Sequence, residues 1–324
     1  MRSLQVAEHG GPESLRLVEV PPPAPAAEQV LVEVHAAGVS FPDLLLTRGQ
    51  YQLQPELPFA PGTEVAGVVL EAPADSPWRP GQRVAAYTPW GGYSEQVAVD
   101  GTALVELPDE VDFVAGAALM NNYQTAYFAL RVRTDLRPGQ TLVVHGAAGG
   151  VGIAAVQVAV ALDARVIAVV RGAEKADFAL GAGCEEVVDL ERVDNWVERV
   201  RELTNGGAEM VFDPVGGERF AQSLRALAPG GKALVIGFAG GEIQQIPSNH
   251  LLLKNVDAVG VAWGMYLVHQ PELLGSIGTE LMRLVGERGM QPLVGSTLPL
   301  ADGAEALRRM DNRAVLGKSV LQVR

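Results

Sequence analysis

The chain has 324 residues, of which 48% are apolar and 19% charged, and its formal net charge is −13 at pH 7. This length allows one large domain or two of ordinary size, and the composition is that of a globular protein. The acidic balance argues against nucleic-acid binding, which depends on clustered Lys and Arg. Apolar stretches stop short of the roughly 18 residues that a membrane span requires.

Two further features bear on where the protein works. Cys184 is the single cysteine, which excludes an internal disulfide and any cysteine-rich zinc site. The first residues, MRSLQVAEHGGPESL, lack the continuous apolar segment of a secretory signal. We therefore expect a cytoplasmic protein in a reducing compartment.

Residues 1 to about 120 alternate short β-rich runs with turns that contain Gly and Pro. The runs are EQVLVEVHAAG (28–38), EVAGVVLEA (64–72), QRVAAYT (82–88) and YSEQVAV (93–99). This spacing predicts a compact β-barrel or sandwich. One helix is expected at 42–49, opened by Ser40 and closed by Gly49. Ser40 and Asp43 also have the spacing of a capping box.

From residue 141 the pattern changes to apolar strands that alternate with helices. The strand candidates are 141–146, 165–170, 185–190, 209–214, 232–239 and 256–263, and the helix candidates are 153–162, 173–183, 194–204 and 218–231. Alternation of this kind predicts a parallel sheet covered on both faces. Six strands is the number found in the doubly wound dinucleotide fold. The tail adds one or two helices and a terminal strand, 319–323, which we expect to return to the first domain.

The segment GAAGGVGIAAVQ (146–157) lies where the first of these strands meets a helix. Glycines at 146, 149 and 152 permit a sharp turn, close approach of the backbone to a pyrophosphate and tight packing of helix against strand. The amides of Gly150 and Val151 would lie at the positive end of the helix dipole, where a diphosphate is favoured. The alternative is a glycine-rich corner that binds no ligand.

The end of the second strand selects between the two nicotinamide cofactors. NAD-binding proteins usually place an acid there, which bonds the ribose 2′-hydroxyl about 20 residues after the glycines. This chain instead has Arg171, followed by Lys175. Two cations suit a 2′-phosphate, so the sequence favours NADPH. The alternative is that both are solvated surface charges.

Four segments together resemble the zinc-independent, zeta-crystallin-like quinone oxidoreductases of the medium-chain dehydrogenase/reductase superfamily. They are GVSFPDLLLTRGQYQLQPELPFAPGTEVAGVV, GAAGGVGIAAVQ, FDPVGG and GKALVIGFAGGEIQQIPSNHLLLKN. The resemblance implies an α/β protein in which a GroES-like β-barrel catalytic domain joins a six-stranded Rossmann domain. It places the catalytic domain at 1–120, completed by 264–324, and the NADPH-binding domain at 121–263. It also implies NADPH and a homodimer.

Zinc-dependent members of the superfamily bind the metal through a Cys in a GxCxxD-like segment and a His in GHE. Here the corresponding positions hold Ser40 and Thr63, which do not replace a thiolate or an imidazole. The four-cysteine structural zinc lobe is missing as well. We therefore predict no metal, and without a Lewis acid the oxidation of an unactivated alcohol is not expected.

The resemblance also assigns candidate site residues. Tyr51 lies in the family's active-site loop, where it either acts on the substrate or packs the loop against the barrel. Ser40 stands at an active-site position that is usually Asn, so that it either contacts the substrate or caps the helix. Around the nicotinamide the resemblance indicates Asn122, Thr125, Gly237, Phe238 and Val261, for several of which ordinary core packing is the alternative.

The most consistent interpretation is a reductase that transfers hydride from NADPH to a quinone. An α,β-unsaturated carbonyl compound or enoyl thioester is the alternative acceptor, since both accept hydride and leave an oxyanion that needs only hydrogen-bond donors and a proton source. A hypothesis of another class is a cofactor-binding structural or sensing protein with little turnover, because fold alone does not determine function.

Overall fold

A computed structural model describes residues 1–246 and 248–324 of the chain. The chain forms two compact units. Unit 1 consists of Met1–Gln124, Gln270–Arg283 and Gln291–Arg324, and unit 2 consists of Thr125–His269 and Leu284–Met290. Within the described residues, no helix is both long enough and apolar enough to cross a bilayer.

Unit 1 is built around a seven-stranded sheet in the part of the chain that the structure describes. Its strands are β3 (Gln29–Val39), β4 (Glu64–Glu71), β5 (Arg83–Tyr87), β6 (Gln96–Asp100), β7 (Leu104–Glu106), β14 (Val294–Pro299) and β15 (Lys318–Gln322). They follow the order β14-β15-β3-β4-β5-β7, and β6 also pairs with β3. A separate antiparallel ribbon, β1 (Arg2–Val6) with β2 (Leu15–Glu19), was not foreseen from the sequence.

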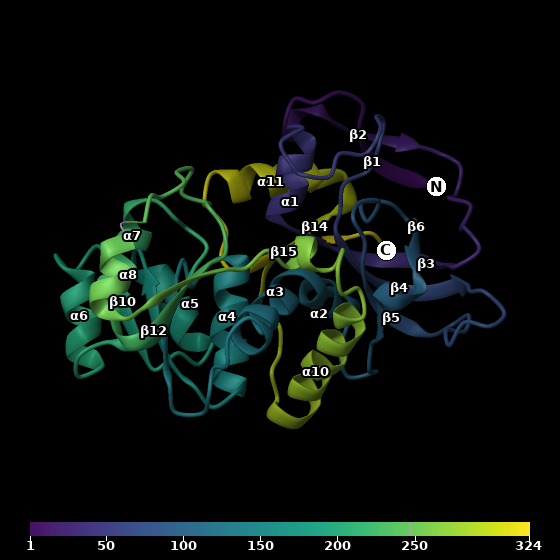
Figure 1. Ribbon diagram of the computed structural model, residues 1–324. Helices are drawn as coiled ribbons and strands as arrows, with labels where there is room; N and C mark the ends of the chain where they lie inside the picture. The colour runs from purple at the N-terminus through teal and green to yellow at the C-terminus, as the bar shows by residue number, and fades with distance from the viewer. Residues whose placement is uncertain (247) are drawn as a thin grey trace. The chain divides into compact units, whose positions relative to one another are not determined.

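The C-terminal strand completes this sheet. β15 pairs antiparallel with β3, so that Val320 lies opposite Gly38, and both ends of the chain lie in unit 1 (Figure 1). β3 is long and buried along most of its length because it pairs with β4, β6 and β15. The sheet therefore has a strand from near the start of the chain at its centre, and the last strand of the chain pairs with it.

Within the described residues of unit 1, four α-helices accompany this sheet. They are α1 (Phe41–Thr47), α2 (Phe113–Ala118), α11 (Gly303–Asp311) and the part of α10 (Leu273–Arg288) that lies before residue 284. The helix predicted at 42–49 is confirmed as α1, with Ser40 at its N-cap. α11 lies beside α1 (Figure 1), and together they cover apolar residues of the sheet.

Unit 2 contains a parallel sheet with the order β10-β9-β8-β11-β12-β13. Its strands are β8 (Thr141–His145), β9 (Arg165–Val170), β10 (Glu186–Asp189), β11 (Ala208–Asp213), β12 (Leu227–Val235) and β13 (Asp257–Gly260). This is the strand order of the doubly wound dinucleotide fold, so the predicted Rossmann sheet is confirmed. The glycine turn lies after β8, beside the point at which the strand order reverses.

The helices of unit 2 are α3 (Gln124–Tyr127), α4 (Gly150–Ala161), α5 (Ala173–Gly181), α6 (Trp196–Leu203), α7 (Glu218–Ala226), α8 (Ser248–Lys254) and α9 (Trp263–Tyr266). The first residue of α3, Gln124, still belongs to unit 1. The helix predicted at 218–231 was too long. It ends at Ala226, and the next strand begins at Leu227. Pro229 rules out the predicted continuation to residue 231, because proline disfavours helical geometry in the preceding residue, Ala228.

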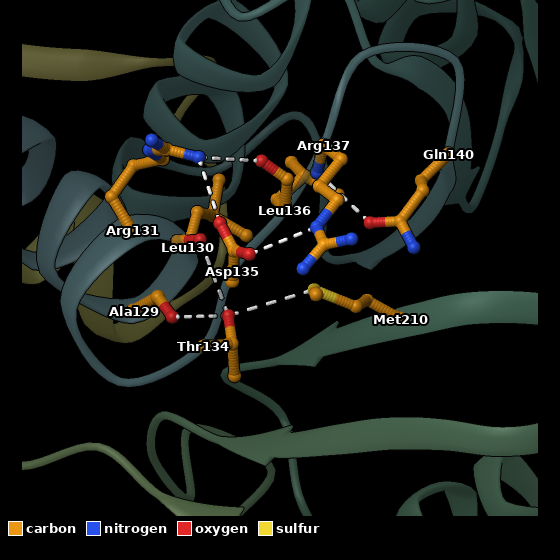
Figure 2. A network of polar contacts seen from close by, with 9 residues as sticks. All are labelled: Ala129, Leu130, Arg131, Thr134, Asp135, Leu136, Arg137, Gln140 and Met210. Carbon is orange, nitrogen blue, oxygen red and sulfur yellow. Dashed lines mark hydrogen bonds and ion pairs between the residues drawn. The ribbon is translucent and has the colours of Figure 1, made fainter.

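A helical run before β8 was also missed. α2 and α3 are separated by a π-helical turn at Leu119–Tyr123, and a second π-helical turn follows at Phe128–Val132. Polar contacts close the loop that leads on to β8 (Figure 2). Asp135 accepts hydrogen bonds from Arg131 (3.1 Å) and Arg137 (2.9 Å), and Thr134 donates to the carbonyl of Ala129 (2.8 Å). These bonds fix the conformation of the loop that precedes β8.

Candidate functional site

The glycine turn of unit 2 has a geometry that only small residues permit. Gly146 has a φ of 57°, in the left-handed region that favours glycine. A Cβ added to Gly152 would lie 2.2 Å from the carbonyl oxygen of Gly146, so no larger residue fits without movement of the backbone. Gly149 is the N-cap of α4 and has no side chain with which to cap it. The first amides of α4, at Gly150 and Val151, are thus left for an anion.

The turn after β9 is held by an acid of the neighbouring strand. Oδ1 of Asp189 accepts hydrogen bonds from the backbone N–H groups of Gly172 (2.9 Å) and Glu191 (3.1 Å). The bond from Gly172 contributes most to lowering the pKa of Asp189, which is therefore ionised. Arg171 is exposed immediately before this turn, and Lys175 lies half-buried in the first turns of α5.

A cavity of about 280 Å³ opens beside Arg171 at the carboxyl edge of the sheet. Its lining includes Arg171, Leu190, Val193, Trp196, Arg219 and Gln222, together with the acids Asp194 and Glu218. Lys175 is not among the lining residues. Arg219 and Trp196 carried no signal in the sequence, because they belong to two different helices that only the fold brings together.

The other residues assigned to the cofactor lie at the ends of strands or in the helical run. Gly237 and exposed Phe238 follow β12, in a loop whose Ala239 N–H donates to the carbonyl of Pro214 (3.0 Å). Val261 is buried, and its N–H donates to the carbonyl of Val235 (3.0 Å). Asn122 lies in the first π-helical turn, in unit 1, and Thr125 lies in α3, in unit 2.

Unit 1 contains a buried ionic cluster around Glu64. The Glu64 carboxylate accepts hydrogen bonds from the Ser40 hydroxyl (2.8 Å), the Asn121 backbone N–H (2.9 Å) and the Lys318 ammonium. Lys318 also donates to Ser40 Oγ (2.6 Å). Lys318 is 1% exposed and Glu64 is fully buried. The Ser40 proton and one of its lone pairs are therefore engaged within the protein.

A second buried acid lies next to this cluster. Asp43 accepts hydrogen bonds from the N–H of Ser40 (2.7 Å), the N–H of Gly62 (3.1 Å) and the hydroxyl of Tyr93 (3.0 Å). Burial outweighs these bonds and raises the pKa of Asp43 to about 6. Ser40 and Asp43 therefore form the predicted capping box, and the Ser40 hydroxyl donates its proton to Glu64.

Two half-buried tyrosines belong to the same region of unit 1. Tyr51 packs against the apolar core of the unit, and burial together with the nearby Asp43 raises the pKa of its hydroxyl. Tyr87 lies opposite Glu64 across the β4–β5 pair, and burial likewise raises its pKa. Both hydroxyls thus stay protonated at neutral pH and can act only as neutral hydrogen-bond donors or acceptors.

The positions that correspond to zinc ligands do not fit the metal. Ser40 and Thr63 offer neutral hydroxyls, and the Thr63 hydroxyl accepts from the Asn121 side chain (2.9 Å). Glu64 is already paired with the Lys318 ammonium. Across the described residues, no three His, Cys, Asp or Glu side chains come together as a metal site would require.

Comparisons with known proteins agree with this description. Residues 26–109 match the family model "Alcohol dehydrogenase GroES-like domain", and residues 150–275 match "Zinc-binding dehydrogenase". The chain is 37% identical over 313 residues to quinone oxidoreductase-like protein 2 of Bos taurus, and the match covers 96% of this chain and 89% of that protein.

Solved structures are similar over the whole chain. A probable oxidoreductase from Mycobacterium abscessus has a TM-score of 0.91 and 41% identity, and the match covers 100% of this chain and 99% of the other. The quinone oxidoreductase of Escherichia coli, solved in complex with NADPH, has a TM-score of 0.90 and 31% identity, with full coverage of both chains.

Replacement of Lys318 by methionine should strongly destabilise the protein. The substitution keeps the apolar stem but leaves Glu64 buried without its cation, which costs about 3–5 kcal/mol in such pairs. Urea denaturation measures the loss, and Lys232→Met, at a half-buried lysine outside the cluster, should change stability by about 0.5 kcal/mol or less. Adding Glu64→Gln to Lys318→Met should recover part of the loss, and strict additivity would contradict the pairing.

The hydrogen bond from Tyr93 to Asp43 should stabilise the protein more at pH 8 than at pH 5. Because the pKa of Asp43 is raised from 3.8 to about 6, the folded protein holds the Asp43 proton more tightly than the unfolded chain does. The stability that this proton contributes is fully present below pH 3.8 and is lost as pH rises through 6. Tyr93 offsets this loss by bonding the ionised form. Tyr93→Phe should thus cost about 1.5–3 kcal/mol at pH 8 and about 1 kcal/mol at pH 5. Equal losses in urea denaturation at both pH values would contradict this assignment.

Proposed function

The chain belongs to the zinc-independent quinone oxidoreductase family of the medium-chain dehydrogenase/reductase superfamily, and on this premise we propose that it is an NADPH-dependent reductase of quinones. The observation that carries the proposal is the glycine turn before α4, which lacks side chains, together with Arg171, the cation that follows β9. The uncapped amides of α4 suit the pyrophosphate, and Arg171 suits the 2′-phosphate. The related quinone oxidoreductase of E. coli is described in complex with NADPH.

The chain's own residues would bind and orient the reactants. NADPH, when bound, supplies a hydride, and one proton from solvent completes the reduction of a quinone to its hydroquinone. As the carbonyl oxygen gains negative charge, a hydroxyl that remains protonated can stabilise it by hydrogen bonding. Tyr51 is proposed for this role, because its raised pKa keeps the proton on the donor. Ser40 is better suited to holding Glu64 than to contacting the acceptor.

Of the remaining candidates, Asn122, Thr125, Gly237, Phe238 and Val261 are proposed to surround the nicotinamide, since ends of parallel strands are where such folds bind ligands. The same donor would serve a conjugated enone, so this acceptor remains the alternative. A cofactor-binding protein without turnover is the alternative of another class. Quinones and enones tested in parallel separate the three hypotheses.

We also propose that the protein is a homodimer. Among the described residues, β13 pairs with β12 alone and so leaves an open edge on the parallel sheet. Leu252 and Leu253 of α8, in the same unit, are each 76% exposed. An unpaired edge near exposed apolar side chains suits a contact between two copies related by a twofold axis.

The enzyme hypothesis predicts that quinones are reduced and that Tyr51 assists. Wild-type protein should oxidise NADPH, followed by loss of its absorbance, when a quinone is added. Tyr51→Phe should lower kcat roughly 100- to 1000-fold, the effect of removing one hydrogen-bond donor to a developing oxyanion, with little change in the Kd for NADPH. Unchanged kcat would assign Tyr51 to packing, and no oxidation with any quinone or enone would contradict the enzyme hypothesis.

The cofactor assignment predicts a selective effect at Arg171. Arg171→Ala should raise the Kd for NADPH by about 10-fold or more, since a charge-assisted bond to phosphate is lost. The Kd for NADH should change far less, because NADH lacks the 2′-phosphate. Isothermal titration calorimetry measures both. Equal losses of affinity for the two cofactors would show that Arg171 does not bind the 2′-phosphate.

A further inference from the structure

We infer that Arg219 is a second anchor for the phosphorylated adenosine end of the cofactor and sets its preference for NADPH together with Arg171. The inference rests on the proposed function, because it assigns a new specificity residue to the same cofactor site. Both arginines line the cavity of about 280 Å³ at the carboxyl edge of the parallel sheet. Arg171 follows β9 and Arg219 lies on α7, so the two cations reach the cavity from different elements.

The place of Arg219 in its helix adds positive charge to one wall of the cavity. It is the second residue of α7, at the end where the helix dipole is positive. The N-cap is Gly217, with a φ of 67°, and it has no side chain to bond the first amides of the helix. A cation beside uncapped amides concentrates positive charge at this end of α7. Glu218, the first residue of α7, offsets part of this charge, and so does Asp213, whose pKa is raised by burial and lowered by Arg219. An anion in the cavity would add to this compensation.

The backbone of Arg219 is fixed to the strand that leads into the glycine turn. The Ser223 hydroxyl donates to the Arg219 carbonyl (3.0 Å), and Ser223 Oγ also lies 2.9 Å from Nε2 of His145, the last residue of β8. Burial lowers the pKa of His145 to about 3, so the ring is neutral. Because Ser223 donates its own proton to Arg219, the tautomer that fits carries its proton on Nε2 and donates to Ser223 Oγ. This relay holds the first turn of α7 against the end of β8.

The far side of the cavity is equally ordered. The ring of Trp196 meets the ring of His145 edge-on, with centroids 4.7 Å apart. The Trp196 indole N–H donates to Oε1 of Gln222, at 2.7 Å. Trp196 and Gln222 both line the cavity, so its wall is formed by residues that already have partners. A ligand would meet a preorganised surface, which lowers the cost of binding.

The charges of the lining make each arginine decisive. Arg171 and Arg219 contribute two positive charges, whereas Asp194 and Glu218 contribute two negative ones. Both acids are exposed, as Arg171 is, and Glu218 accepts a hydrogen bond from Gln222 (3.1 Å). Loss of either arginine leaves the lining with a net negative charge. Such a cavity would repel a 2′-phosphate but would tolerate a 2′-hydroxyl.

The test compares ligands with and without the 2′-phosphate by isothermal titration calorimetry. The pairs are NADPH with NADH, and adenosine 2′,5′-bisphosphate with 5′-AMP, which isolate the adenosine end. Arg219→Gln should raise the Kd for the two 2′-phosphorylated ligands roughly 10- to 100-fold, as expected for a lost charge-assisted bond, and the Kd for the other two less than 3-fold. Arg225→Gln, on the same helix but outside the cavity, is the matched control and should leave all four values unchanged.

Arg219→Lys keeps the positive charge but loses the planar guanidinium group, so it should lose only part of the affinity for the 2′-phosphorylated ligands. This variant also tests the inference if Arg219→Gln fails to fold. An unchanged preference for NADPH in Arg219→Gln would overturn the inference, and so would equal losses for all four ligands. The proposed function fails separately, if the wild-type protein itself does not bind NADPH more tightly than NADH.

Discussion

The buried pair of Lys318 and Glu64 is the constraint on which unit 1 depends. Lys318 opens the last strand of the chain and Glu64 opens β4, so the pair joins segments that lie 254 residues apart. Two charges removed from water are tolerable only when every donor and acceptor is satisfied. The Ser40 hydroxyl and the Asn121 N–H supply the remaining bonds to Glu64. Wrong pairings of β15 would leave the Glu64 carboxylate buried without its cation, so the cluster favours the observed register of β15 on β3.

Unit 2 depends on a complementary constraint, which is the absence of side chains. The turn after β8 brings the Gly146 carbonyl close to the start of α4, and a Cβ at Gly152 would collide with it. The same scarcity of side chains leaves the first amides of α4 without a side-chain cap, so the packing requirement and the proposed anion site are one feature. Fixed side chains surround this bare turn, since His145 and Ser223 join β8 to α7.

Local signals accounted for most of the fold but little of the polar chemistry. The six strands of the parallel sheet and α1 follow from apolar runs and a cap, which depend on neighbouring residues. β1 and β2 were missed because they form a small ribbon with exposed positions. Lys318 gave no signal, although it is one of only four lysines and is followed by apolar residues. Arg219 and Trp196 share a cavity only because α6 and α7 pack together.

The ionisation of unit 1 bears on the proposed chemistry. Asp43 is fully buried and its oxygens bond to three donors, so its proton has no direct path to a substrate. Burial raises the pKa of both Tyr51 and Tyr87, which makes them poor acids but persistent hydrogen-bond donors. A hydroquinone oxyanion near such donors is stabilised without taking their protons, and its proton then comes from water. Donors of this kind suit acceptors that are already electrophilic, and this is why the proposed reaction needs no Lewis acid.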